Sequence, residues 1–468
     1  MIEKTLKEIA NMIGGKISDD KFSDVKIKGI STDSRTIDPG ELYIPLVGEV
    51  FDGRIFIKEC ENKGAKAFLI DNPEKINKTV SIPHIKVADT KKALQDLATA
   101  YRNELSYKVI AITGSNGKTT TKDLLYGVLS EKYKTQKTMG NLNNDIGVPK
   151  TVLSLNPETE VAIIELGTDN FGDIALTSPM VKPDISIITN IGDSHLHNLK
   201  SKSGILKAKL EILDGMKDDG LFIYNIDDPT MRDEIPTYDI KQKVLSFGTS
   251  DDADFKIKIE KSPSSKISFS HEDELYEVPL IGEHNIYNAA AVVMISEILG
   301  LSKETIDNGF MKAKSSQNRT ELLECEGFDV LDDSYKSNPQ SLQAGLETAY
   351  MLEGYKRKIV CLADMLELGE NEKELHRGVG LKIDSKKIDY CLFYGPLARE
   401  MYEASLENFP QDRSLYFEHK DELIEKLKSL VIGASLIFVK GSHGMHMEEV
   451  IESIKYFNIW KRYPWFTQ

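Results

Sequence analysis

A glycine-rich loop with one lysine and several hydroxyl groups could bind phosphate in this chain. The loop reads TGSNGKTT, and its candidate nucleotide-binding residues are Gly114, Ser115, Asn116, Gly117, Lys118, Thr119 and Thr120. Glycines let backbone N–H groups turn toward a phosphate, the lysine adds positive charge, and the next hydroxyl can bind Mg²⁺. The alternative is a glycine turn with a solvated lysine. The spacing also differs from G-x-x-x-x-G-K-[ST], because Ile112 stands five positions before Gly117.

Two further side chains could bind a metal ion. Glu165 ends the apolar segment VAIIE, and His195 lies just past DISIITNIG. Open α/β sheets place their ligands at the carboxyl ends of strands, and a carboxylate there is a suitable oxygen ligand for Mg²⁺. The alternative for Glu165 is a helix-capping acid. A lone histidine is often simply packed or exposed, so the residues alone leave the role of His195 open.

The segments around these residues alternate between strand and helix patterns. From Lys108 onward, short apolar runs rich in β-branched residues alternate with longer helical stretches, which predicts βαβ units and a mostly parallel sheet. The runs are KVIAITG, VAIIELG, DISIITNIG, GLFIYNIDD, KRKIVCLADM, DYCLFYGP and SLIFVKGS. The helical segment TKDLLYGVLS follows the phosphate loop, so the positive end of its dipole would add to phosphate binding.

Three other regions differ from this pattern. The segment 254–280 alternates with period two, which predicts an antiparallel ribbon, and helical HNIYNAAAVVMISEILGL follows it. The basic, polar stretch KAKSSQNR then indicates a domain junction. Before Lys108, the helical segment KKALQDLATAYRNEL closes a first region that contains STDSRTIDPGELYIPLVG and KAFLI, and this region is typical of a small α/β domain.

Length and charge limit the classes of function. At roughly 150 residues per domain, 468 residues suggest about three domains. The 59 basic and 74 acidic residues give a net charge of −15, which argues against binding nucleic acid or a membrane surface through bulk positive charge. The sequence contains no run of about 18 apolar residues, which is the length that a membrane-spanning helix needs. The start MIEKTLKEIANMIGG lacks the apolar core of a signal peptide, so we expect a cytoplasmic protein.

Ten motifs between residues 31 and 442 follow one another in the order seen in the Mur ligase family. They are STDSRTIDPGELYIPLVG, VIAITGSNGKTTTKDLL, GNLNNDIGVP, IIELG, TNIGDSHL, KAKLEI, GEHNIYNA, DDSYKSNP, ADMLELGE and FVKGS. The Mur ligases are ATP-dependent amino-acid and peptide ligases of peptidoglycan synthesis, and this set most resembles the members that add D-alanyl-D-alanine. The resemblance covers nearly the whole chain.

The resemblance implies an α/β fold with three domains. Residues 1–105 would form a small α/β domain that binds the UDP end of the substrate. Residues 106–316 would form a central domain with a P-loop-type, mostly parallel sheet that binds ATP and Mg²⁺. Residues 317–468 would form a Rossmann-like α/β domain that closes on the nucleotide and binds the incoming dipeptide.

The resemblance also assigns metal ligands. The matching histidine in the family serves a second Mg²⁺, which favours this role for His195. The matching lysine is carbamylated by CO₂, and we assign that role to Lys209 rather than Lys207 because Lys209 precedes Glu211 at the family's spacing. The surrounding KAKLEI looks like a helix start, and its alternative is a solvated lysine. The implied metal set is Thr119, Glu165, His195 and Lys209.

For the nucleotide, the resemblance places Asn285 and Asn288 near adenine, whose edge needs both donors and acceptors. Capping of a helix by Asn285 is the alternative. Arg319, at the domain junction, would reach the γ-phosphate when the domains close. Asp333 would meet the nucleotide from the C-terminal domain, although either Asp332 or Asp333 could be a turn residue instead.

For the acceptor, the resemblance gives two groups of residues. The UDP moiety would contact the loop 46–48 together with Asp33, Ser34 and Arg35. A peptide carboxylate would be oriented by Asn141, Asn143 and Asn144, whose alternative is a polar loop that only turns. Three positions depart from the family. They are Arg54, where His is common, His197, where Glu is frequent, and Lys336, where Asn is usual. These departures bear on the acceptor and the dipeptide and leave the ligase chemistry intact.

The implied reaction joins D-alanyl-D-alanine to the terminal carboxylate of a UDP-N-acetylmuramoyl-tripeptide through an acyl phosphate. ATP and Mg²⁺ would serve it, with catalytic residues Lys118, Lys209, His195 and Arg319. We expect a monomer without a nucleic-acid partner or stable membrane insertion. The alternatives are a Mur-type ligase that adds a single amino acid, an archaeal pseudomurein peptide ligase and, in another class, a non-catalytic NTP-binding switch. A non-catalytic switch has no need of a second metal site, so the second set of metal ligands argues against this alternative.

Overall fold

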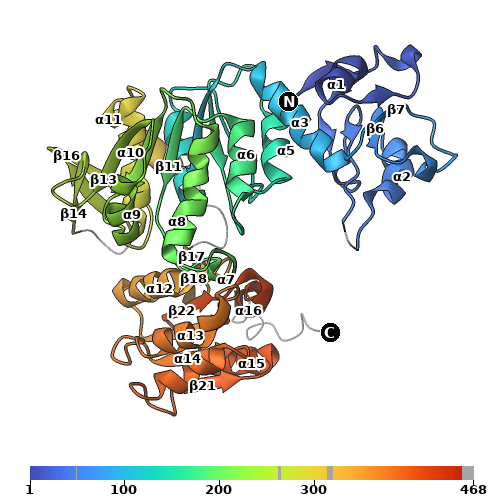
Figure 1. The fold of residues 1–468 in the computed structure, drawn as a ribbon. Helices are drawn as coiled ribbons and strands as arrows, with labels where there is room; N and C mark the ends of the chain where they lie inside the picture. Colours follow the sequence, from blue (N-terminus) through green and yellow to red (C-terminus); the bar gives the residue numbers. More distant parts are fainter. Residues whose placement is uncertain (49, 262–264, 314–319, 456–468) are drawn as a thin grey trace.

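The computed structural model describes residues 1–48, 50–261, 265–313 and 320–455, and it consists of three α/β units in chain order (Figure 1). The N-terminal unit, in blue, and the C-terminal unit, in orange and red, contact different sides of the central unit. The family of folds expected from the sequence, mixed α/β with mostly parallel sheets, is confirmed. The domain boundaries themselves stay a prediction.

The N-terminal unit contains a five-stranded sheet and a two-stranded sheet. The larger sheet has the order β2 (Lys16–Ile17), β7 (His84–Lys86), β6 (Ala67–Ile70), β5 (Leu42–Tyr43) and β4 (Ile30–Ser31), and only β2 is antiparallel. The smaller sheet pairs β1 (Glu3–Thr5) with β3 (Lys26–Lys28). The helices are α1 (Leu6–Met12), α2 (Ile57–Asn62) and α3 (Thr90–Asn103). Ile2 and Leu97 share one apolar core with Val152 of the central unit, so these two units are joined by buried surface.

The central unit is a nine-stranded sheet in which the strand before the phosphate loop, β8 (Lys108–Thr113), is an interior strand, third from one edge. From the opposite edge the order is β16 (Glu274–Val278), β15 (Ile267–His271), β14 (Phe255–Glu260), β13 (Lys243–Gly248), β12 (Leu221–Asn225), β11 (Ile185–Ile188), β8, β10 (Val161–Glu165) and β9 (Thr135–Lys137). The strands β8 to β13 are parallel. The chain crosses from one side of β8 to the other between β10 and β11, and such a reversal point is where doubly wound sheets bind ligands.

The expected antiparallel ribbon is confirmed as β14 to β16, and the pairing of β13 with β14 makes it an extension of the main sheet. Helices cover both faces of the sheet. One face packs on α4 (Lys118–Leu129), α10 (Asn285–Ile298) and α11 (Lys303–Lys312). The other packs on α5 (Gly147–Ser154), α6 (Asp173–Val181), α8 (Lys202–Leu210) and α9 (Pro229–Glu234). The short α7 (Leu196–Leu199) follows His195.

The C-terminal unit is a six-stranded sheet between two layers of helices. Its order is β17 (Glu321–Cys325), β18 (Phe328–Asp333), β22 (Ser435–Lys440), β19 (Arg357–Ala363), β20 (Tyr390–Tyr394) and β21 (Ser414–Phe417), and only β17 is antiparallel. One face packs on α12 (Pro339–Met351), α13 (Glu372–Gly380) and α14 (Ala398–Ser405). The other packs on α15 (Lys420–Leu430) and α16 (Glu448–Lys455).

One local prediction was wrong, and two lie outside the described residues. The segment KAKLEI was expected to start a helix, but Lys209 lies in the last turn of α8 and Glu211–Gly215 continues as a 3₁₀ turn. The helix begins earlier because the Ser201 hydroxyl accepts from the Gly204 N–H at 3.0 Å and caps it. Arg319 and most of the junction KAKSSQNR lie outside the described residues. None of the helices in the described part of the chain is long and apolar enough to cross a bilayer.

Candidate active site

A cleft between the central and C-terminal units brings most of the predicted site residues together. The predicted residues that line it are Ser115, Asn116, Gly117, Lys118, Thr120, Asn141, Asn143, Glu165, Asn285, Asn288 and Asp333. The central unit contributes the carboxyl ends of β8 and β10 and the start of α10, and the C-terminal unit contributes the ends of β18 and β22. The sequence placed the phosphate loop and Glu165 at strand ends, and parallel strands deliver their carboxyl ends to one edge.

The phosphate loop needs its glycines for space. Gly117 has a φ of +81°, and a Cβ there would lie 2.3 Å from the Asn288 side-chain oxygen. A Cβ at Gly114 would lie 1.9 Å from the Thr189 hydroxyl. The helix α4 begins directly after Gly117, so the free N–H groups of its first turn add to the attraction for an anion. The loop therefore has the geometry of a phosphate cradle.

Glu165 has a polar environment built by three elements. The Thr119 hydroxyl donates to one carboxylate oxygen at 2.9 Å, and the Asn143 amide donates to the other at 2.8 Å. The Lys122 ammonium lies 3.5 Å from Glu165 and donates to the Gly140 carbonyl at 3.0 Å. Lys122 is 1% exposed, and its burial lowers its pKa. Sequence reasoning did not identify Lys122, because a lysine at this helix position is ordinarily solvated.

Lys118 donates to the Gly114 carbonyl at 2.6 Å, so its ammonium lies folded over its own loop. Thr119 reaches Glu165 beneath the loop and is itself buried. The pairing of Thr119 with Glu165 brings two oxygen ligands suitable for Mg²⁺ to one place. Helix capping by Glu165, the alternative considered from the sequence, does not occur, because its oxygens accept from side chains.

His195 lies at the contact between the two units. Its Nδ1 is 3.0 Å from the Glu367 carboxylate of the C-terminal unit and 3.3 Å from Asp169. His195 and Glu367 both have positive φ angles, of 58° and 67°. The hydrogen bond with His195 lowers the pKa of Glu367. The motif ADMLELGE contained Glu367, but nothing in its spacing indicated that it would meet His195.

A buried histidine supports the loop that carries Glu367. The Met365 N–H donates to His376 Nε2 at 2.9 Å, and His376 Nδ1 lies 2.6 Å from the Glu372 carbonyl. An acceptor at Nε2 and a donor at Nδ1 require the neutral ring, and burial lowers the pKa of His376 accordingly. The loop is therefore held by a neutral imidazole.

Lys209 is a buried amine at the end of α8. It is 3% exposed, and among the residues that the structure describes it has no hydrogen-bond or ion-pair partner. Burial holds the pKa of its amine well below the ordinary value, and the charges of Lys118 and Lys336 add to this effect. The solvated lysine considered from the sequence is therefore wrong, and the neutral amine is favoured.

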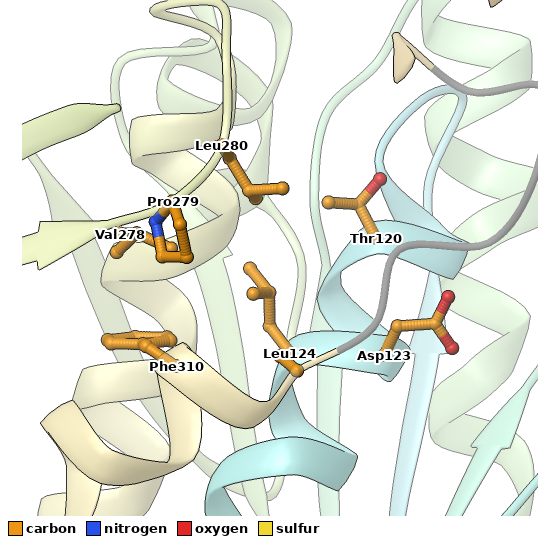
Figure 2. A pocket seen from close by; sticks show the side chains of 8 residues that line it. Thr120, Asp123, Leu124, Val278, Pro279, Leu280 and Phe310 are labelled. Atoms are coloured by element: carbon orange, nitrogen blue, oxygen red, sulfur yellow. The ribbon is translucent and has the colours of Figure 1, made fainter. Parts of the chain in front are cut away.

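The start of α10 lines the cleft next to the phosphate loop. The Asn288 amide donates to the Asn285 side-chain oxygen at 2.8 Å, and Thr121 donates to Asn288 at 3.3 Å. The Asn285 amide donates to the Ile281 carbonyl at 2.8 Å. Helix capping by Asn285 is not seen, because His284 occupies the N-cap position. A smaller, mainly apolar pocket adjoins this part of the cleft (Figure 2). It is lined by Thr120, Asp123, Leu124, Val278, Pro279, Leu280, Phe310 and Ala313.

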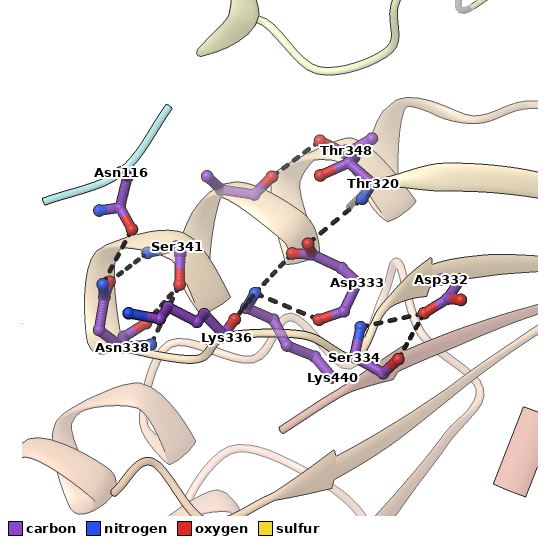
Figure 3. Close-up of polar contacts among 11 residues, drawn as sticks. Asn116, Thr320, Asp332, Asp333, Ser334, Lys336, Asn338, Ser341, Thr348 and Lys440 are labelled. Carbon is purple, nitrogen blue, oxygen red and sulfur yellow. Dashed lines mark hydrogen bonds and ion pairs between the residues drawn. The ribbon is translucent and has the colours of Figure 1, made fainter. Parts of the chain in front are cut away.

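On the C-terminal side, two neighbouring aspartates have different roles (Figure 3). Asp332 accepts from the N–H and hydroxyl of Ser334 at 3.0 and 2.7 Å, so it is the turn residue. Asp333 lines the cleft and pairs with Lys440, which is 1% exposed, at 2.5 Å. The Thr320 N–H donates to the other oxygen of Asp333 at 3.2 Å. The sequence had left the choice between these two aspartates open.

One side chain joins the C-terminal unit directly to the phosphate loop. The Asn338 amide donates to the Asn116 side-chain oxygen and to the Ser194 hydroxyl, both at 2.9 Å. Its own oxygen accepts from the Ser341 N–H at 2.8 Å and caps α12. Asn338 was missed as a site residue, although it stands in the quoted motif DDSYKSNP. The two halves of the cleft are therefore in contact.

Some predicted residues lie outside the cleft lining. Asn144 accepts from the Gly147 N–H at 2.8 Å and holds the turn before α5. Asp33 and Arg35 pair with each other in the N-terminal unit, and this pairing lowers the pKa of Asp33 to about 2. Arg54 is largely buried and pairs with two aspartates. The predicted residues outside the lining are Asp33, Ser34, Arg35, Gly114, Thr119, Asn144, His195 and Lys209.

Comparisons with known proteins cover the chain almost completely. Family models match as the Mur ligase middle domain at residues 112–296, as the Mur ligase, glutamate ligase domain at 318–443 and as the Mur ligase family, catalytic domain at 26–102. The UDP-N-acetylmuramoyl-tripeptide--D-alanyl-D-alanine ligase of Bacillus subtilis (strain 168) is 37% identical over 97% of this chain and 99% of its own length.

Two solved structures are similar over the same length. A crystal structure of MurF from Acinetobacter baumannii has 30% identity and a TM-score of 0.88, covering 97% of this chain and 99% of that one. The MurF ligase from Thermotoga maritima in complex with ADP has 26% identity and a TM-score of 0.79, covering 92% and 97%. With the phosphate loop, the strand-end residues and the three units in the same order, the chain belongs to the Mur ligase family.

Proposed function

We propose that the chain is an ATP-dependent ligase that joins D-alanyl-D-alanine to the terminal carboxylate of a UDP-N-acetylmuramoyl-tripeptide in peptidoglycan precursor synthesis. The observation that carries this proposal is the similarity along the full length to a ligase of that name, at 37% identity. The cleft supports it, because a phosphate loop on one side faces charged residues of a second unit on the other.

The reaction needs an activated carboxylate, because a carboxylate is a poor electrophile. A carboxylate oxygen attacks the γ-phosphorus of ATP, and the bond between this phosphorus and the β,γ-bridging oxygen breaks. The products of this step are ADP and an acyl phosphate. The dipeptide amine then attacks the acyl carbon, phosphate leaves with the electron pair, and the nitrogen loses a proton. Lys118 would turn from the Gly114 carbonyl to the phosphates and offset their charge. Arg319 is proposed to add positive charge from the junction.

The residues present fit Mg²⁺. Thr119 and Glu165 supply oxygen atoms at one place, and phosphate-bound Mg²⁺ characteristically uses only one or two carboxylates. Within the described ranges no three His, Cys, Asp or Glu side chains form a metal cluster, so phosphate oxygens and water would complete the coordination. When bound, Mg²⁺ would neutralise charge on the phosphate oxygens. We propose Thr119, Glu165, His195 and Lys209 as the ligand set.

The environment of Lys209 fits a carbamate. Its neutral amine can attack CO₂, which forms an N–C bond and releases one proton, and the product carries a carboxylate-like group. The burial of Lys209 without a described partner is consistent with a site that such an added group would complete. The carbamate would convert a buried amine into an anion able to bind Mg²⁺.

The three units are proposed to divide the substrates. Residues 1–105 would bind the UDP end through Asp33, Ser34 and Arg35. Residues 106–316 would bind ATP through the phosphate loop, Asn285 and Asn288. Residues 317–468 would bind the dipeptide. Asn141, Asn143 and Asn144 would orient the peptide. Because residues of a single chain complete the cleft, we propose an active monomer. Its nucleotide-linked substrates favour the cytoplasm, and its partners include neither nucleic acid nor a membrane.

A product assay tests the proposed function. Purified protein receives ATP, Mg²⁺ and UDP-N-acetylmuramoyl-tripeptide with a panel of D,D-dipeptides and single amino acids, and mass spectrometry identifies the product. We expect a UDP-linked pentapeptide with D-alanyl-D-alanine and one ADP and one phosphate per bond. A preference for a single amino acid would contradict the assignment. Rapid ATP hydrolysis without acceptor or dipeptide would contradict the ligase mechanism.

A further inference from the structure

Lys336 is a lysine of the cleft whose ammonium forms no ion pair with a residue that the structure describes, although its charge is, after the hydrogen bond with His195, a further cause of the lowered pKa of Glu367. Lys336 lies after β18, in the turn that leads to α12, and it lines the cleft. Within the described residues, its ammonium makes no hydrogen bond and no ion pair. Figure 3 shows its aliphatic chain extended away from Lys440, with no dashed line at the ammonium. The other two lysines that line the cleft, Lys118 and Lys440, both have partners within the protein.

The other charged side chains of the cleft lining make hydrogen bonds or ion pairs within the protein. Lys440 pairs with Asp333 at 2.5 Å, and Lys118 donates to the Gly114 carbonyl. Glu165 accepts from Thr119 and Asn143, while Asp228 accepts from the Ile191 N–H at 2.7 Å and from backbone N–H groups at the start of α9. The cation of Lys336 is therefore available to an anion that enters the cleft.

The backbone of Lys336 is held firmly while its side chain is not. The buried Lys440 donates to the Lys336 carbonyl at 2.8 Å. Two residues further on, Asn338 donates to Asn116 of the phosphate loop at 2.9 Å. The first turn of α12 also lines the cleft through Gln340 and Ser341. These contacts fix the turn against the phosphate loop, so the nearest built anion site is the one for phosphate.

We propose that Lys336 is a catalytic residue that the C-terminal unit places on the γ-phosphoryl group of ATP when it meets the phosphate loop. This inference rests on the proposed function. The ammonium donates to non-bridging oxygens of the γ-phosphate and keeps its proton while the carboxylate oxygen bonds to phosphorus and ADP departs. Because Lys118 acts from the central unit, the phosphoryl group is neutralised from both sides only when the two units are in contact.

Nucleotide binding to the Lys336→Met variant tests this proposal. Calorimetry compares ADP with a β,γ-methylene analogue of ATP, in the presence of Mg²⁺. A charge-assisted contact to the γ-phosphate predicts that analogue affinity falls about tenfold or more while ADP affinity is unchanged. The turnover number should fall with it, and Lys336→Arg should restore part of both. The matched control is Lys382→Met, which removes an exposed lysine of the same unit outside the cleft.

Two results would overturn the proposal, and they are unchanged analogue affinity and an equal loss of ADP affinity. If unchanged analogue affinity is accompanied by a selective rise in KM for the dipeptide, Lys336 is assigned to a substrate carboxylate instead. Thermal unfolding checks that the variant is folded, and we expect it to be, because among the described residues the hydrogen bond to Lys336 is accepted by its backbone carbonyl, which the substitution keeps. Failure of the wild-type protein to ligate D-alanyl-D-alanine would contradict the proposed function, whereas the binding comparison needs no ligation.

Discussion

Single residues at the site combine a buried position with an ionisable group, and Lys209, which lies outside the cleft lining, is the strongest example. A lysine usually keeps its ammonium in water, because transferring an isolated charge into a protein interior is costly. Lys209 is 3% exposed, and the nearby charges of Lys118 and Lys336 further disfavour its protonation. The position therefore suits an amine that reacts with CO₂ better than it suits a surface lysine.

Replacing Lys209 by Ala should abolish ligation and leave nucleotide binding intact. Loss of the proposed metal ligand predicts a fall in kcat of about a hundredfold or more. The Kd for ADP, measured by calorimetry, should stay within about twofold, because the phosphate loop holds the diphosphate. Lys207→Ala is the matched control, since Lys207 is exposed on the same helix. Unchanged ligation in Lys209→Ala would remove the proposed role.

The carbamate also predicts a dependence on CO₂ and pH. Carbamate formation consumes the neutral amine and releases a proton, so it is favoured as pH rises, and the lowered pKa of Lys209 moves that gain toward neutral pH. Wild-type protein depleted of CO₂ should lose activity, and added bicarbonate should restore it. Activity that is independent of bicarbonate in carefully degassed buffer would argue against a carbamate.

At the scale of elements, strand ends and helix starts position the site. Asn338 does two things at the start of α12, because its oxygen caps the helix and its amide reaches the central unit. The two tasks use different atoms of one side chain. They can therefore be separated by substitution.

Replacing Asn338 by Asp should keep the helix cap and lose the contact with the phosphate loop. A carboxylate still accepts from the Ser341 N–H, but it cannot donate to Asn116 or Ser194. We expect the unfolding temperature of Asn338→Asp to stay near that of the wild type while kcat falls about tenfold. Asn338→Ala should lose both the activity and about 1 kcal/mol of stability. Equal kcat in wild type and Asn338→Asp would show that this contact has no part in the reaction.

The sequence predicted elements better than it predicted contacts between them. The βαβ pattern and the motifs are local, so the strands β8, β10, β11 and β12 and the positions of Glu165 and Asp333 followed from them, whereas the short strand β9 was not predicted. The contact of Asn338 with Asn116 spans 222 positions, and no short motif encodes such a distance. The helix around Lys209 was misplaced because KAKLEI has no cap of its own, whereas Ser201 lies outside that motif.

At the scale of the whole molecule, the two junctions between units differ in kind. The N-terminal and central units share an apolar core that includes Ile2, Leu97 and Val152. The C-terminal unit meets the phosphate-loop side through polar contacts of Asn338 and Glu367. Hydrogen bonds of this kind contribute about 1 kcal/mol each, so bound ligands can readily shift the equilibrium between contacted and separated units. We therefore propose that the reaction is confined to the contacted state.

In the proposed reaction, the carboxylate of the tripeptide is activated by phosphoryl transfer and then joined to D-alanyl-D-alanine. The most direct test uses UDP-N-acetylmuramoyl-tripeptide labelled with ¹⁸O in both oxygens of its terminal carboxylate, together with ATP, Mg²⁺ and the dipeptide. Mass spectrometry of phosphate and peptide should find one ¹⁸O in each phosphate released and one in the new amide. Phosphate without ¹⁸O, or phosphate formed equally fast without the dipeptide, would contradict the account.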